Sequence, residues 1–185
     1  MTSVIAGLTL SLDGFFEDAD GSAAALYTDL ESLQDSAYLT SMQAETGAVL
    51  MGRRTFEMAG DPDSYADTYE LQVPLFVVTH RLPDREPKRN ERLFVTFVTD
   101  GVEAAVAGAT AAAGDKAVQV VGGADLNRQL LAAGLVDELR IDVMPVLLGE
   151  GRRLFDDVPP GSVRLEKLGV EEAGARTTLR FRVLR

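Results

Sequence analysis

The chain lacks cysteine and tryptophan altogether, holds a single histidine, His80, and has no long apolar run. Without cysteine it can form neither a disulfide nor a thiolate metal site, which fits a cytoplasmic protein. One histidine cannot build a histidine-rich centre, so no metal site is predicted. No stretch approaches the ~20 apolar residues of a transmembrane helix, and the start MTSVIAGLTLSLDG lacks the basic residues of a signal peptide.

Positive charge is also scarce, with 18 lysines and arginines against 29 acidic residues and a net charge of −11. Nucleic-acid phosphates need a basic surface, so neither a nucleic-acid partner nor a membrane partner is expected. A small phosphorylated ligand in a local arginine pocket is still compatible with this balance. At 185 residues and 46% hydrophobic content, the chain is expected to form one domain over 1–185.

Strand and helix signals alternate along the chain. Short apolar runs predict strands at 4–12, 48–51, 75–79, 93–98, 117–121 and 138–143. Helical spacing predicts helices at 23–46, at 100–113 and after Gly122-Gly123. Alternating apolar and polar residues around Gly174 predict an antiparallel hairpin at the C-terminal end. The predicted fold is therefore an α/β domain with a mostly parallel central sheet, flanking helices and an antiparallel C-terminal hairpin.

Gly122-Gly123 stands between a predicted strand and a predicted helix. Such a junction points backbone N–H groups outward and leaves room for an anion such as a diphosphate. The same sequence also makes a tight turn that binds nothing, and for two glycines alone that is the commoner outcome. More than this pair is needed to predict a ligand.

Several predicted strand ends supply the further evidence. In open α/β sheets, ligands bind beyond the carboxyl ends of the strands. The ends in question are Asp13-Gly14, Gly52-Arg53-Arg54-Thr55, Thr79-His80-Arg81 and Gly122-Gly123. Together they offer glycine backbone, three arginines, threonine and histidine. This set predicts a pocket for a ligand with a diphosphate and a further phosphate, the latter held by arginine.

Five sequence blocks in this order carry a family resemblance: SLDG, MGRRTF, VVTHR, VVGGADLNRQLLAAGLVDEL and MPVLLGEGRRLF. The chain resembles the dihydrofolate-reductase-like superfamily over nearly its whole length. It is most similar to the reductase domain of bifunctional riboflavin-biosynthesis deaminase-reductases. The resemblance implies a cytoplasmic homodimer, NADPH as hydride donor, and a flat nitrogen heterocycle such as a pteridine or pyrimidine as acceptor.

The resemblance also assigns residues to the cofactor. The glycine turn and the helix start after it would bind the diphosphate, and the other two strand ends would bind the adenosine half. The predicted cofactor-binding residues are Gly52, Arg53, Arg54, Thr55, Thr79, His80, Arg81, Gly122, Gly123, Ala124, Asp125 and Leu126. No acid lies within GRRT or THR to bind ribose hydroxyls, so NADPH is predicted to be preferred over NADH.

The catalytic residues are less clearly indicated. Dihydrofolate reductases carry a carboxylate on the first helix that protonates the pterin, and Asp29 is the candidate for it, with Glu31 and Asp35 as alternatives. A single helical acid is more often a solvated surface residue. Asp13 is a candidate neighbour of the nicotinamide, or it makes only an Asx turn before Gly14.

Two departures from the aminouracil reductases bear on the activity. Those enzymes usually carry a lysine before SLDG and a glutamate before Gly-Gly, where this chain has Gly7 and Val121. The sequence therefore predicts an NADPH-dependent reductase whose acceptor is open. The alternatives are a non-catalytic nucleotide-binding protein that retains the fold, and an aminouracil reductase that uses other residues. A two-fold dimer is expected to involve the hairpin 163–184 and the segment 145–155.

Overall fold

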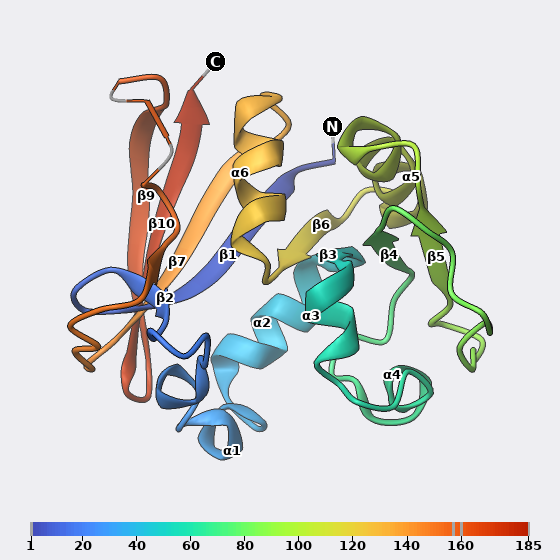
Figure 1. Cartoon of the computed structure of the whole chain (residues 1–185), viewed down its shortest axis with the longest axis horizontal. Helices are drawn as coiled ribbons and strands as arrows, with labels where there is room; N and C mark the ends of the chain where they lie inside the picture. Colours follow the sequence, from blue (N-terminus) through green and yellow to red (C-terminus); the bar gives the residue numbers. More distant parts are fainter. Residues whose placement is uncertain (1, 157, 160, 185) are drawn as a thin grey trace.

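The computed structural model describes residues 2–156, 158–159 and 161–184, and it confirms the predicted α/β architecture (Figure 1). The main sheet has the strand order β5-β4-β3-β6-β1-β7-β10-β9. Pairings from β5 across to β7 are all parallel, whereas β10 runs antiparallel to both β7 and β9. None of the helices in these ranges is long and apolar enough to cross a bilayer.

The elements agree closely with the predicted strands. The strands are β1 Val4–Ser11, β2 Phe15–Glu17, β3 Thr46–Gly52, β4 Leu75–Val78, β5 Val95–Val98, β6 Ala117–Val121, β7 Glu138–Met144, β8 Arg152–Arg153, β9 Arg164–Ala173 and β10 Arg176–Leu184. The helices are the 3-10 helix η1 Ala24–Leu26, α1 Leu30–Leu33, α2 Ala37–Glu45, α3 Arg53–Glu57, α4 Ser64–Thr68, α5 Val102–Ala113 and α6 Ala124–Ala132. Strands β2 and β8 form a small separate sheet.

Helices cover both faces of the central strands, which is why these strands are apolar almost throughout. Because side chains alternate along a strand, Val118 and Val120 of β6 face a core shared with α5 and α6. On the opposite face, Val49 and Met51 of β3 pack against Phe56 of α3 in a second core. Residues of this second core, among them Tyr69 and Leu71, also line the cleft described below.

The helix predicted over 23–46 is wrong as a single element, since the segment forms η1, α1 and α2. A new helix begins after Ser36, whose side chain accepts a hydrogen bond from Leu39 N at 3.2 Å. No residue of α2 is fully buried. Of the apolar residues whose spacing predicted one helix, Leu26 is buried in η1, whereas Leu30 and Leu33 belong to α1 and line a cleft.

The predicted C-terminal hairpin is confirmed. Strands β9 and β10 pair from Arg176–Ala173 to Leu184–Arg164, and the turn between them uses Gly174 at φ +61°. Strand β9 forms one edge of the sheet (Figure 1, left). Its outer side chains Leu165 and Val170 are 45% and 54% exposed. Such an edge is usually covered in the native assembly.

Candidate functional site

The strand ends predicted to form the site lie side by side, because β4, β3, β6 and β1 are consecutive neighbours in the sheet. The Gly122-Gly123 turn after β6 is in contact with the start of α3. A β-carbon added at Gly122 would lie 2.9 Å from Thr55 Cγ2, and one at Gly123 would lie 3.4 Å from Thr55 Oγ1. Two of the predicted motifs therefore meet.

Both glycines of the turn adopt conformations that other residues rarely adopt. Gly122 has φ +64° and Gly123 has φ +74°. The turn is fixed from behind by Asn127, which is 1% exposed and donates from Nδ2 to Gly122 O at 3.4 Å and to Gly123 O at 3.2 Å. Gly123 also starts α6 without a side-chain cap, so the helix presents its first N–H groups outward.

The arginine-rich segment connects to the end of β4. Arg53 donates from Nη1 to the carbonyl of Arg81 at 3.4 Å, and its Nε pairs with Glu57 at 2.5 Å. Thr79 is buried and donates from Oγ1 to the same carbonyl at 2.9 Å. His80 lies exposed in this turn. Three of the predicted segments therefore form one continuous rim.

The remaining predicted cofactor residues differ in what they can offer. The side chain of Arg54 is 71% exposed and lies 3.9 Å from Glu17. Ala124 and Leu126 are buried in the core, so only their backbone is available. The side chain of Asp125 is 71% exposed and lies 3.8 Å from Arg152. Gly52 begins α3 without a side-chain cap.

These residues fit a nucleotide diphosphate. Gly122 has no side chain that would fill the turn, and helix α6 begins beside it without a side-chain cap. Exposed arginines lie on the rim. Helix starts and arginines are the groups that bind phosphates in proteins. Which of them contacts a cofactor stays a prediction.

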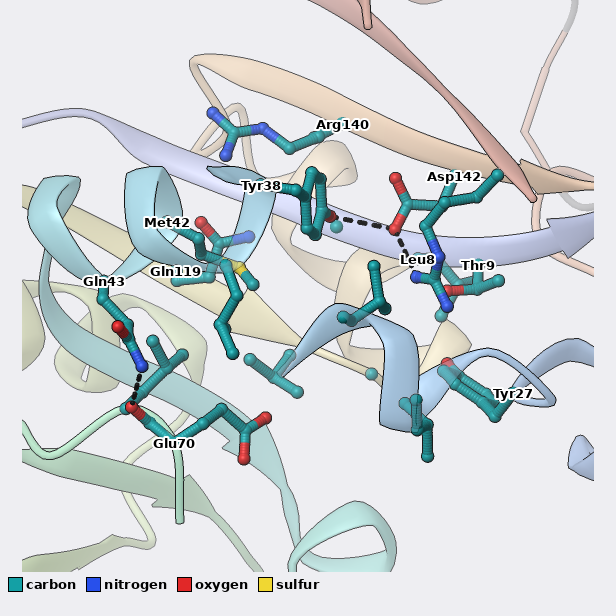
Figure 2. A pocket seen from close by; sticks show the side chains of 18 of the residues that line it. Leu8, Thr9, Tyr27, Tyr38, Met42, Gln43, Glu70, Gln119, Arg140 and Asp142 are labelled. Carbon is teal, nitrogen blue, oxygen red and sulfur yellow. Dashed lines mark hydrogen bonds and ion pairs between the residues drawn. The ribbon is translucent and has the colours of Figure 1, made fainter. Parts of the chain in front are cut away.

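A cleft of about 520 Å³ adjoins the turn on the α3 face of the sheet. Strands β1, β6 and β7 form its floor, and Tyr27, α1, α2 and residues 68–71 form its walls (Figure 2). Gly122 is itself part of the lining, so the cleft and the glycine turn are one site. Gln43 donates from Nε2 to Glu70 O at 3.0 Å and joins two walls at one end. The volume suits a small flat molecule.

A buried charge cluster lies at the other end of the cleft. Arg176 of β10 donates from Nε and Nη2 to Asp29 at 2.8 and 2.6 Å, and from Nη1 to Asp142 at 2.9 Å. Tyr38 of α2 donates to Asp142 Oδ2 at 2.9 Å, as Figure 2 shows. Thr178 donates to the other oxygen at 2.5 Å. The cluster fixes both α2 and the segment before α1 to the sheet.

Asp29, the predicted proton donor, is the capping residue before α1 and lies behind Arg176, outside the cleft lining. The hydrogen bonds from Arg176 hold the pKa of the Asp29 carboxyl below its ordinary value, outweighing the opposite effect of burial. The carboxyl is therefore charged at neutral pH. This geometry fits a positioning residue better than an acid.

Asp13, the other predicted catalytic residue, crosslinks two loops. It accepts hydrogen bonds from Ser11 Oγ at 2.5 Å, from Leu148 N at 3.1 Å and from Gly149 N at 2.7 Å. The Ser11 hydrogen bond, helped by the two backbone N–H groups, lowers the pKa of Asp13 to about 2. Both interpretations from the sequence stay open, although these hydrogen bonds all hold the loops together.

A second charge cluster lies along β7. Arg140 pairs with Glu45 of α2 and, at 3.2 Å, with Glu138. Arg180 of β10 donates to Glu138 at 2.8 Å. Burial alone would raise the pKa of Glu138, but the two arginines lower it. Each arginine that lines the cleft, Arg140 and Arg176, is thus held between two carboxylates.

Sequence reasoning missed these polar residues of the floor. A signal was present, because Glu138, Arg140 and Asp142 alternate with Leu and Ile in a strand that is central and buried. Gln119 likewise interrupts a run of valines in β6. Polar side chains in a buried strand need partners or a ligand, so such positions indicate a site.

The sheet and its flanking helices have the dihydrofolate-reductase-like fold, with a glycine turn beside a cleft on the sheet. Residues 2–179 match the family described as the RibD C-terminal domain, and the chain belongs to this family. Its relatives include the uncharacterized protein YyaP of Bacillus subtilis (strain 168), which is 28% identical over 84% of this chain and 81% of its own.

Two solved structures illustrate the fold. A protein from Shewanella sp. PV-4, provisionally assigned to riboflavin biosynthesis, superposes with a TM-score of 0.76 at 21% identity, with both chains covered completely. Dihydrofolate reductase from Enterococcus faecalis, solved in complex with NADP(H) and RAB-propyl, superposes with a TM-score of 0.63 at 19% identity. That alignment covers 99% of this chain and 97% of the reductase. Family and fold point to an oxidoreductase of this type.

Proposed function

We propose that the protein is an NADPH-dependent reductase that transfers hydride to a small nitrogen heterocycle of pteridine or pyrimidine type. The observation that carries the proposal is the continuity of the site: the 520 Å³ cleft includes Gly122, the first residue of the diphosphate-type turn. If the diphosphate of the cofactor rested on this turn, its nicotinamide would lie toward the adjoining cleft, where a flat acceptor would bind.

The chain's own contribution is binding and orientation. NADPH would supply the hydride, and the diphosphate would rest on the backbone of Gly122, Gly123 and the start of α6. Arg53, Arg54 and Arg81, from two neighbouring strand ends, would hold the remaining phosphate. The apolar walls of the cleft would exclude water from the reacting atoms.

The proton that completes the reduction is proposed to come from water. Asp29 is held in its charged form by Arg176, so its role is to position that arginine and the segment before α1. Asp13 is proposed to fix the loop at Leu148 and Gly149 beside the cofactor. Neither carboxyl needs to carry a proton at neutral pH for these roles.

The charged state of Asp29 also supports a second candidate function. Asp29, the predicted acid, pairs with Arg176, whose hydrogen bonds hold the pKa of the Asp29 carboxyl below its ordinary value, so it holds no proton to donate at neutral pH. A non-catalytic nucleotide-binding protein that retains the reductase fold would also need no such acid. The two candidates share the cofactor site and differ only in turnover.

Fluorescence titration with NADPH, followed by oxidation assays on panels of pteridines and aminouracils, tests the proposal. A reductase should bind NADPH at micromolar concentration and oxidise it with at least one panel member. Binding without turnover across both panels would favour the nucleotide-binding protein. No binding of NADPH at all would refute both candidates.

We also propose that the protein acts as a cytoplasmic homodimer. The edge strand β9 exposes apolar side chains, of which Val170 at 54% and Leu165 at 45% are the most exposed. A second copy placed on this edge by a two-fold axis would cover the same patch on both subunits.

A further inference from the structure

The cleft contains a buried side-chain amide that has no partner. Gln119 of β6 is 4% exposed, and its Oε1 accepts no hydrogen bond within the described residues. Its neighbours Val118 and Val120 face the core under α5 and α6, so the alternation of the strand turns Gln119 toward the cleft. An unpaired buried amide destabilises a protein, which suggests that a ligand completes it.

The chain leaves space for a ligand next to this amide. Gly7 of β1 stands beside Gln119, and a β-carbon added there would lie 3.1 Å from Nε2. A side chain at position 7 would therefore crowd the carboxamide at the floor of the cleft. A second buried polar atom, Tyr69 OH, also has no partner among the described residues, and Tyr69 lines the same cleft.

The charges around the cleft disfavour an anionic ligand. Its two lining arginines, Arg140 and Arg176, are each already held between two carboxylates. At the opposite end, Glu70 is exposed in the lining (Figure 2). Nε of Arg140 is unpaired among the described residues, but both lining arginines already face two carboxylates each, so a phosphate or carboxylate entering here would meet an excess of negative charge.

We propose that the cleft binds an uncharged, unphosphorylated heterocycle and that the carboxamide of Gln119 recognises its amide edge. The proposal rests on the proposed function, because it specifies the acceptor for the same cleft. A carboxamide offers one donor group and one acceptor oxygen, which pair with an adjacent C=O and N–H of a lactam ring. A site built in this way rejects an analogue that lacks the N–H.

The first test measures binding of lumazine and of 1,3-dimethyllumazine, whose ring N–H groups are methylated. The variants are Gln119→Leu, of similar size, and Gln129→Leu as matched control, since Gln129 is exposed on α6 and lies outside the cleft lining. We expect Gln119→Leu to weaken lumazine binding about 5- to 30-fold and to leave the weak binding of the dimethyl analogue unchanged. Gln129→Leu should change neither. Equal affinity of Gln119→Leu and wild type for lumazine would overturn the role of Gln119.

A stability measurement separates recognition from a structural role. Because Oε1 is unpaired in the free protein, Gln119→Leu should melt at the same temperature as wild type or higher. A structural glutamine would instead lower the melting temperature on substitution. Gln119→Glu, a second variant at the same position, should also lose lumazine while keeping NADPH, because a carboxylate cannot donate to the ring carbonyl.

NADPH binding distinguishes failure of this inference from failure of the proposed function. If wild type binds NADPH but neither lumazine nor uridine, the inferred acceptor class is wrong while the cofactor proposal stands. If NADPH is not bound, the proposed function itself fails. Uridine 5′-monophosphate should compete with lumazine for the cleft no more strongly than uridine does, at any salt concentration. Tenfold stronger competition by the phosphate, lost at high salt, would refute the uncharged ligand.

Discussion

Asp29, the acid that the sequence predicted on the first helix, has two possible roles. It is either a proton donor or the ion-pair partner of the buried Arg176. A proton donor can be replaced by asparagine with loss of activity and little loss of stability. A partner of a buried arginine cannot. The variant Asp29→Asn therefore distinguishes the two roles by its stability, before any substrate is known.

The expected magnitude follows from the geometry. Asp29 accepts two hydrogen bonds from Arg176, at 2.8 and 2.6 Å, and the two side chains are 7% and 4% exposed. A hydrogen bond to a charged group contributes about 1.5–3 kcal/mol, and asparagine keeps one acceptor of the two. We expect Asp29→Asn to lower the free energy of unfolding by about 2–4 kcal/mol, out of a total of about 5–15 kcal/mol. The melting temperature should fall by roughly 4–16 °C for a chain of this size.

Urea and thermal unfolding followed by far-ultraviolet circular dichroism measure this effect, with Asp35→Asn as control. Asp35 is an exposed acid of the same segment and was an alternative proton donor, so its substitution should change stability by less than about 0.5 kcal/mol. A variant Asp29→Asn that unfolds with the wild-type midpoint would refute the structural role. If that variant also lost turnover with a known acceptor, Asp29 would be the acid after all.

The pH dependence gives an independent check with a definite sign. The folded-state pKa of Asp29 lies below its unfolded value of about 3.9. The ion pair therefore stabilises the fold above the unfolded pKa, and this contribution is lost as the pH falls through the folded pKa. The stability gap between wild type and Asp29→Asn should be constant from pH 5 to 8 and shrink below about pH 4. A gap that grows on acidification would contradict the assignment.

Three further predictions concern the cofactor and the assembly. Gly123→Val should abolish NADPH binding. Because φ is +74° at this position, the substitution should also lower the free energy of unfolding by about 1–3 kcal/mol. The control Gly134→Val, at φ +66° with open space around it, should lower stability by the same amount and leave NADPH binding unchanged. Unchanged NADPH affinity in folded Gly123→Val would remove the glycine turn from the site. Among Arg53→Ala, Arg54→Ala and Arg81→Ala, at least one should lose roughly ten- to a hundredfold in NADPH affinity while binding NADH nearly as before; equal weakening of both cofactors by all three would mean that these arginines hold the shared diphosphate. Sedimentation at micromolar concentration should give twice the 19.9 kDa monomer mass, and Val170→Lys on the exposed edge should shift the protein to monomer; a wild-type monomer would refute the dimer.

Local patterns determined most of the fold. Runs of β-branched residues, glycines that end them and the alternation around Gly174 predicted the strands of the main sheet and the C-terminal hairpin, and the structure confirms them. The position of each motif at the end of a predicted strand also predicted which strand ends lie together. These features are readable because each depends on residues adjacent in sequence, and because parallel strands present their carboxyl ends at one edge.

The tertiary structure alone decided the chemistry of the cleft. The helix predicted over 23–46 is broken before α2, and α2 covers a cleft and not a core; apolar spacing cannot distinguish these two environments. Asp29 meets Arg176 across 147 positions, and the register of β10 on β7 places that arginine beside Asp142. Whether a carboxyl is a proton donor or an ion-pair partner depends on neighbours brought in by such long-range pairing. For the same reason, the sequence marks Gln119 only as a polar residue in a buried strand, because Gly7 beside it and Tyr69 in the same cleft lining come from distant segments.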